Sequence, residues 1–137
     1  MKHPLLIPMA LYVFYIWSLA LYNFRTRLRA IKNGQVSLKY FKTYADPAAS
    51  ERVIVVGRHY DNQFQLPLLF LITCALHLTV ASEGPATLAF AWAFVISRFF
   101  HSWIHLGRNH VPKRALAFAL GWLAILLLWV QLILISM

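Results

Sequence analysis

The stretch RHYDNQFQLPLLFLITCALHLTVA, residues 58–81, begins with a polar cluster and continues as an apolar run. The apolar part, the 16 residues from Leu66 to Ala81, would cover roughly 24 Å as a helix that rises about 1.5 Å per residue. This length is shorter than a hydrocarbon core about 30 Å thick. We therefore expect the polar cluster to begin near the membrane edge, inside a membrane-spanning helix.

The composition of the whole chain supports a membrane location. Of 137 residues, 61% are hydrophobic and only 12% are charged, and the mean hydropathy is +0.62. Ordinary soluble domains are about 45–50% apolar and about 25% charged. The composition therefore excludes an ordinary soluble domain and predicts an integral membrane protein. The single cysteine, Cys74, lies within an apolar run and excludes an internal disulfide.

Four apolar runs are each close to the roughly 20 residues that cross a bilayer as a helix. They cover Pro4–Phe24, Val53–Ala81, Pro85–Leu106 and Ala115–Met137. The first run lacks a clear cleavage site, so we interpret it as a mature span rather than a signal peptide. No internal repeat or second domain is visible in the sequence. We therefore predict one all-α domain over residues 1–137, an integral membrane four-helix bundle.

The basic residues indicate how the spans are oriented. Lysine and arginine concentrate in two connections, residues 24–52 and 107–114, whereas the connection at residues 82–85 carries only Glu83. The positive-inside rule then places both basic connections in the cytoplasm and both termini outside. The formal net charge of +9 is therefore first a signal of topology. Because the charges lie at helix ends rather than on a solvated face, we expect no nucleic-acid partner.

Polar side chains recur at helical spacing in the second and third spans. One stripe consists of Arg58, Asp61, Asn62 and Gln65, and the other of Arg98, His101 and His105. Ionisable groups inside a span cost about 2.5 to 3.5 kcal/mol each on insertion scales, and they normally face a bundle interior or a wet cavity. We therefore predict a site between helices that opens to the cytoplasm. Interhelical hydrogen bonding alone is the alternative role for Asn62 and Gln65.

The order and spacing of these residues resemble the MAPEG family, the membrane-associated proteins in eicosanoid and glutathione metabolism. The matching pattern is Arg58-x-x-x-Asn62-x-x-Gln65-x-Pro67, then Arg98-x-x-His101-x-x-x-His105-Leu106-Gly107, then Pro112-Lys113-Arg114. Arg27-Leu28-Arg29 resembles the basic exit from the first helix of that family. The resemblance covers most of the chain, including its length, its four apolar runs and its two basic connections.

The resemblance implies a fold, an assembly and a site. Members of this family are four-helix bundles that form trimers and hold glutathione between neighbouring subunits near the cytoplasmic side. Carried over by position, the residues that would line this site are Arg27, Arg58, Asn62, Gln65, Arg98, His101, His105 and Arg114. The resemblance assigns Arg114 and His105 to catalysis and the others to binding of glutathione as cofactor, with no metal. The expected partners are two further copies of the chain, membrane lipid and a lipophilic small-molecule substrate.

The chemistry of glutathione suits these residue types. Its two carboxylates match arginine forks, and its ammonium group matches an acceptor such as Asp61 or Gln65. A free thiol has a pKa of about 8.5, which a nearby cation lowers, so Arg114 is suited to hold a thiolate. We therefore expect a glutathione-dependent transferase or peroxidase that acts on lipophilic electrophiles or hydroperoxides.

Two positions depart from the family pattern. Gln65 stands where glutamate is usual, and His105 stands where eicosanoid-making members commonly have tyrosine, so an eicosanoid substrate is not expected.

Two alternative functions stay open. The first alternative is a non-catalytic lipid-binding or scaffold protein of the same fold. The second is a metal or haem protein built on His101 and His105, with His59 and His110 as further ligands. Against a metal, no carboxylate or cysteine accompanies the pair at ligand spacing, and the nearby arginines would repel a cation.

Overall fold

The computed structural model describes residues 2–44 and 49–137, and every element within these two ranges is a helix. The elements are α1 (Leu6–Lys32), α2 (Tyr40–Thr43), α3 (Glu51–Asp61), the 3-10 helix η1 (Asn62–Phe64), α4 (Leu66–Thr79), α5 (Pro85–Leu106) and α6 (Val111–Ser136). The prediction of an all-helical chain is confirmed for the described residues. The first basic connection includes residues 45–48, which lie outside them.

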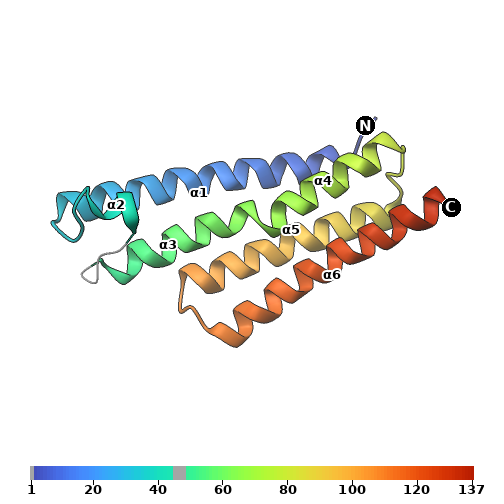
Figure 1. Ribbon diagram of the computed structural model, residues 1–137. Coiled ribbons are helices and arrows are strands. Elements are labelled where there is room, and N and C mark those ends of the chain that lie inside the picture. The colour runs from blue at the N-terminus through green and yellow to red at the C-terminus, as the bar shows by residue number, and fades with distance from the viewer. Residues whose placement is uncertain (1, 45–48) are drawn as a thin grey trace.

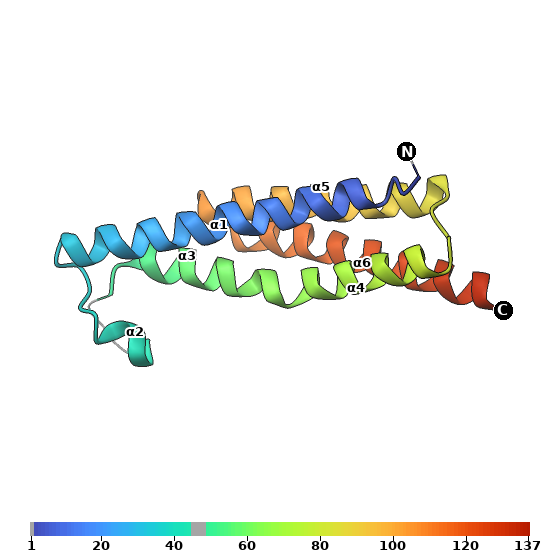
Figure 2. The ribbon, with the colours of Figure 1, turned by 90° about the horizontal axis from the view of Figure 1, so that it is seen from above.

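The long helices lie side by side and alternate in direction (Figure 1, Figure 2). α3, η1 and α4 follow one another along the bundle, so they occupy one position in it together. Both termini and the α4–α5 connection lie at one end, and α2 and the α5–α6 connection lie toward the other. The most extensive packing joins α5 with α6, followed by α1 with α3 and α4 with α6.

Three helices, α1, α5 and α6, are long and apolar enough to cross a membrane. The expectation of one continuous helix over residues 53–81 is wrong, because the chain breaks at the polar cluster. α3 ends at Asp61, and Gln65 has φ −100° and ψ −101°, outside the helical region. Pro67 has no backbone N–H to donate and is tolerated in the first turn of a helix, so α4 begins anew at this point. The 14 residues of α4 cover about 21 Å by themselves.

An apolar core fills the part of the bundle around α4. The rings of Phe70 and Phe94 stack with their centroids 4.2 Å apart, and Tyr12 packs edge-on against both rings. Cys74 is buried in the same core and is free, as the sequence predicted. At Gly121 a Cβ atom would lie 3.1 Å from Ser97 Oγ, so a glycine at this position lets α6 approach α5 closely.

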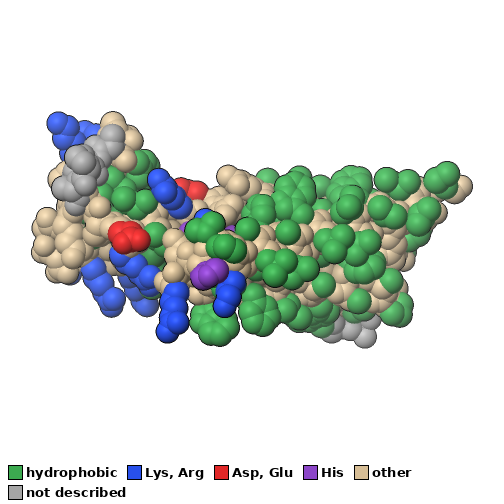
Figure 3. Space-filling view, turned by 90° about the horizontal axis from the view of Figure 1, so that it is seen from below, with side chains coloured by type: hydrophobic (Ala, Val, Ile, Leu, Met, Phe, Trp, Pro, Cys, Tyr) green, Lys and Arg blue, Asp and Glu red, His purple; other side chains and the backbone are tan. Residues whose placement is uncertain are grey.

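The surface has a charged part at one end of the bundle and an apolar part along the rest of it (Figure 3). On the face shown in Figure 3, lysine, arginine and acidic side chains gather at the end that carries α2, and the remainder is mostly apolar. At the opposite end, His3 Nδ1 lies 2.7 Å from Glu83 Oε1, and the backbone N–H of Leu5 donates to Glu83 Oε2 at 3.1 Å. The hydrogen bond with His3, reinforced by the one from Leu5, holds the pKa of the Glu83 carboxyl below its ordinary value of 4.5. Glu83 therefore ties the start of the chain to the α4–α5 connection.

Candidate functional site

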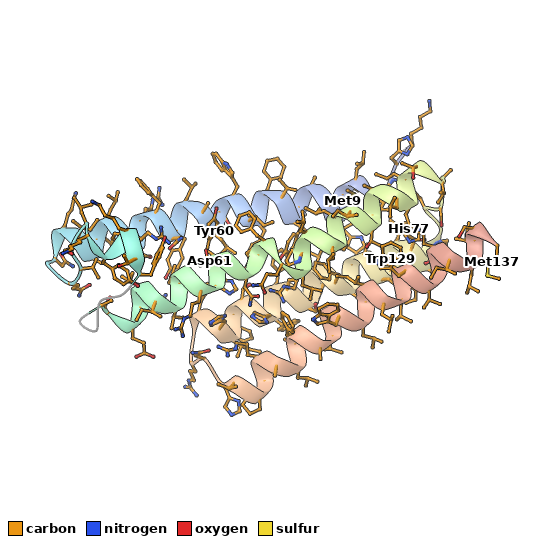
Figure 4. All side chains as sticks on the ribbon, in the orientation of Figure 1. Met9, Tyr60, Asp61, His77, Trp129 and Met137 are labelled. Carbon is orange, nitrogen blue, oxygen red and sulfur yellow. The ribbon has the colours of Figure 1, made fainter. Side chains whose placement is uncertain are left out.

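A cavity of about 420 Å³ lies between α3, α5 and the start of α6, and we call it the arginine–histidine cavity. Its polar lining residues are Arg58, Asn62, His101, His105, Asn109 and Arg114. Five of these six were predicted from the sequence, and all five lie together as expected. Figure 4 shows nitrogen-bearing side chains gathered between these helices, close to the segment in which Tyr60 and Asp61 are labelled.

The α5–α6 connection positions Arg114 at the cavity. Gly107 ends α5, where a Cβ atom would lie only 2.8 Å from the carbonyl oxygen of Trp103. Asn109 follows with φ +48°, a left-handed conformation that asparagine tolerates better than most residues. Its Oδ1 accepts a hydrogen bond from Arg114 Nη1 at 2.6 Å. Asn109 was not predicted as a site residue, although an asparagine in a short segment with a glycine before it and a proline after it is typical of a turn.

Arg98 is completely buried behind the cavity, with 0% of its side chain exposed. Its Cζ atom lies 5.3 Å from the ring centroid of Phe118, which lines the cavity. Within the described structure none of the three guanidinium nitrogens makes a hydrogen bond. A buried cation without a partner is destabilising by several kcal/mol, roughly. Arg98 therefore calls for an acceptor from outside the described chain.

Three buried histidines pack together beside Arg98. The Nδ1 atoms of His59 and His105 are 3.2 Å apart, and the His101 ring stacks on the His59 ring at 5.9 Å. Gln63 Nε2 lies 3.4 Å from His59 Nε2 and donates to the His59 carbonyl oxygen at 2.8 Å. Gln63 Oε1 in turn accepts a hydrogen bond from the Tyr12 hydroxyl at 2.7 Å. This chain of polar contacts connects α1 to a histidine at the cavity.

The sequence model of the MAPEG family matches residues 5–134, nearly the whole chain. The chain belongs to the MAPEG family. A comparison with curated proteins finds no match to it. The MAPEG family includes glutathione transferases and peroxidases, and its members commonly use glutathione. All the residues that line the arginine–histidine cavity lie within the matched segment.

The stripe predicted for the second MAPEG span is only partly correct. Asp61 and Gln65 are exposed, and Gln65 does not line the arginine–histidine cavity. The buried face of α3 and η1 instead carries Val53, Val56, His59 and Gln63. These residues are spaced at three or four positions, a signal that was present in the sequence. Arg58 and Asn62 border this face, which is why they reach the cavity while Asp61 and Gln65 do not.

Arg27 lies in a second cavity, of about 200 Å³, between α1, α2 and α3. Its guanidinium lies over the rings of Phe41 and Tyr44, 5.2 and 5.6 Å from their centroids. Arg58 lines both cavities, and Asp61 lines only the second. The structure therefore places Arg27 next to the arginine–histidine cavity, with Arg58 between them, rather than inside it.

The histidine cluster is the candidate position for a metal in this MAPEG protein. The ligand atoms of His59, His101 and His105 all lie within 4.8 Å of one another. The Arg98 and Arg114 cations oppose a dication there, and the cluster found in the described residues contains no carboxylate or thiolate. His110 does not join the cluster, because it is exposed and its ring accepts a hydrogen bond from the backbone N–H of Lys113.

Proposed function

We propose that the chain is a membrane-embedded glutathione-dependent transferase or peroxidase that acts on lipophilic electrophiles or hydroperoxides. The observation that carries the proposal is the charge around the arginine–histidine cavity. Arg58 and Arg114 line it, Arg98 is buried beside it with three unpaired nitrogens, and no acidic residue is among its described lining residues. Such a site favours an anionic ligand. Glutathione supplies two carboxylates and a thiolate, and the family commonly uses it.

The architecture proposed with this function is a single domain, residues 1–137, with four membrane spans. The second span consists of α3, η1 and α4, both basic connections are cytoplasmic, and both termini are external. We propose a homotrimer, with membrane lipid around it, in which a neighbouring copy completes each site. The exposure of Arg58 and Gln65 and the unpaired nitrogens of Arg98 support a site that needs groups from outside the described chain.

Arg114 is the proposed group that holds the thiolate. One of its nitrogens is tied to Asn109, which fixes the guanidinium at the cavity and leaves other N–H groups for an anion. Arg114 also lies in the first turn of α6, where the helix dipole adds partial positive charge. A cation and a helix N-terminus both lower the pKa of a nearby thiol. We assign His105 to donate a hydrogen bond to the reacting ligand.

The other predicted residues bind the rest of glutathione in this proposal. Arg58, Asn62 and His101 line one side of the arginine–histidine cavity, with Arg98 buried behind them, and this set suits a carboxylate. Arg27, in the adjoining cavity, suits the second carboxylate. Gln65 would reach glutathione only in a neighbouring subunit, because its own side chain is exposed.

The proposed chemistry starts from the thiolate. In the transferase reaction its sulfur forms a bond with an electrophilic carbon, and the leaving group departs with the bonding electrons. In the peroxidase reaction the thiolate sulfur bonds to the terminal oxygen of the hydroperoxide as the O–O bond breaks, which gives a sulfenic acid and an alkoxide that takes up a proton and leaves as the alcohol. The thiol of a second glutathione then attacks the sulfenic sulfur, which forms the disulfide and releases the oxygen as water. An apolar groove of about 620 Å³ between α5 and α6 supports a lipophilic substrate. The same groove also supports the second candidate function, lipid binding without catalysis.

Titration calorimetry on the detergent-purified chain tests this proposal. We expect glutathione to bind, and the ultraviolet absorbance of the same mixture to rise as the thiolate forms. S-methylglutathione should bind without that rise in absorbance, because it has no ionisable thiol. If neither compound binds, the proposed glutathione site is wrong. Binding of glutathione without ionisation would favour the lipid-binding alternative over the enzyme.

A further inference from the structure

We infer that Tyr12, Gln63 and His59 form a hydrogen-bond relay that locks His105 with its proton on Nε2. His105 then presents a fixed N–H donor to the arginine–histidine cavity. Gln63 and His59 are positioning residues in this inference, since neither is among the residues that line the cavity. The relay is a property of the unliganded chain, and only its effect on glutathione rests on the proposed function.

The first step is the orientation of the Gln63 side-chain amide. One of its terminal atoms lies 2.8 Å from the carbonyl oxygen of His59. A carbonyl oxygen only accepts hydrogen bonds, so the facing atom must be the amide nitrogen, Nε2. The other terminal atom, Oε1, then accepts from the Tyr12 hydroxyl at 2.7 Å.

The second step fixes the proton of His59. Gln63 Nε2 carries two hydrogens, and one of them is used by the His59 carbonyl oxygen. The other faces His59 Nε2 at 3.4 Å, so this ring nitrogen is the acceptor and carries no proton. The single proton of the neutral His59 ring must then lie on Nδ1. A neutral histidine side chain in water favours the proton on Nε2, so the relay holds His59 in its less favoured tautomer.

The third step passes this constraint to His105. The two Nδ1 atoms are 3.2 Å apart, a contact in which one ring donates and the other accepts. Since His59 carries its proton on Nδ1, His59 donates and His105 Nδ1 accepts. The proton of the neutral His105 ring is therefore on Nε2. Neutral rings are expected, because both rings are buried and a charged ring would lie near the Arg98 and Arg114 cations.

The relay also favours an anionic ligand over a bound metal ion at the histidine cluster. A zinc ion bound by both Nδ1 atoms would move the proton of His59 to Nε2, where it would face the N–H of Gln63. Two donors would then point at each other in a buried region in which His59 and Gln63 are each only 1% exposed. With the relay intact, Arg58, Arg114 and His105 all present donors to the cavity. This set of donors selects for an anionic ligand.

The tautomers can be measured directly by nitrogen NMR of histidine-labelled chain in detergent, without glutathione and at neutral pH. Two-bond nitrogen–proton correlations distinguish the two neutral forms and the doubly protonated ring. We expect His59 protonated on Nδ1 and His105 on Nε2, with each signal assigned by replacing that histidine alone. A proton on Nε2 of His59, a doubly protonated ring at either position, or bound zinc in metal analysis of the same sample would overturn the relay.

Replacement of Gln63 shows whether the relay sets the tautomers. In Gln63→Met the amide is lost, so we expect His59 to move toward the Nε2 form and His105 toward the Nδ1 form. The matched control is Gln131→Met, since Gln131 donates a hydrogen bond to Thr87 Oγ1 at 2.8 Å, near the other end of the bundle. The control should keep both tautomers. If Gln63→Met does not fold, Tyr12→Phe is the second variant, because it removes the donor to Oε1 and is expected to produce the same shift to a smaller extent.

Ligand affinity gives a second measurement that depends on the proposed function. In Gln63→Met the cavity loses the N–H donor of His105, so glutathione binding should weaken by about tenfold, as for one hydrogen bond to a charged group. Gln131→Met should bind glutathione as the wild type does. Unchanged His59 and His105 tautomers in a folded Gln63→Met variant would contradict the relay even if the wild type binds glutathione. If the wild type binds no glutathione, the proposed function fails, while the NMR result by itself still supports or overturns the relay.

Discussion

The part of the bundle around α4 buries mostly apolar side chains, whereas the part around α3 also buries several polar side chains and one cation. α5 passes through both, and one face of this helix changes character between Val95 and Arg98. Its first half buries apolar residues such as Phe94, and its second half buries Arg98, His101 and His105. The apolar half is closely packed, whereas the polar half contains a cavity and unpaired nitrogen atoms. Packing around α4 therefore stabilises the fold and offsets the unfavourable burial of the Arg98 cation.

The largest expected effect on stability is in the apolar half. Phe94→Ala removes a ring that stacks on Phe70 at 4.2 Å, and it should lower the free energy of unfolding by about 3 to 5 kcal/mol. The control is Phe100→Ala on the same helix, because 53% of Phe100 is exposed and its loss should change stability little. Thermal unfolding of both variants in the same detergent gives the comparison. Equal losses of unfolding free energy in the two variants would show that the packing around Phe94 contributes no more to stability than an exposed ring does.

The next effect concerns the rate of the proposed reaction in the polar half. Arg114→Ala should lower kcat with a chlorodinitrobenzene by about 10² to 10³, as for a lost donor to a developing or stabilised anion. Arg108→Ala is the control, because Arg108 is exposed, lies in the same α5–α6 connection and lines neither the arginine–histidine cavity nor the apolar groove between α5 and α6. Steady-state kinetics with both substrates varied will separate kcat from KM. A loss confined to the KM for glutathione would mean that Arg114 binds glutathione without activating its thiol.

A smaller effect, opposite in sign, is expected from Arg98→Met. Replacing a buried, unpaired cation with an apolar side chain of similar length should raise the free energy of unfolding by about 1 to 4 kcal/mol. The same change should weaken glutathione binding, because the buried positive charge is lost. Thermal unfolding and calorimetry on one preparation test both parts. A loss of stability would show that Arg98 already has a partner, such as a group from a neighbouring copy.

The smallest effect is a pH dependence at the far end of the bundle. The pKa of Glu83 is lowered in the folded chain, so its contribution to stability is present above 4.5 and is lost as the pH falls through the lowered value. Glu83→Gln should therefore flatten the decline of the unfolding temperature below a pH of about 4.5. Glu51→Gln, at the start of α3, is the control. Identical acid profiles for the wild type and Glu83→Gln would show that the tie to His3 and Leu5 does not stabilise the fold.

Periodicity located part of the site and missed part of it for an identifiable reason. Arg58 with Asn62, and His101 with His105, are spaced four residues apart within stretches that do fold as helices, so they reach the cavity as predicted. Gln65 was assigned to the same stripe on the assumption of an unbroken helix. The chain leaves the helical conformation at that residue, so its predicted position no longer holds.

The sequence by itself determined the helical class, the membrane character, the family and five of the residues that line the cavity. It did so because apolar length, charge asymmetry and helical spacing are local properties of the chain. Tertiary structure alone decided that Arg98 is buried with no hydrogen-bond partner among the described residues, that Arg27 occupies a separate cavity, and that Tyr12 reaches Gln63. The hydrogen bond between Tyr12 and Gln63 joins residues 51 positions apart, and no periodic pattern encodes such a pairing. It arises only when α1 packs beside η1 and one buried hydroxyl must find an acceptor.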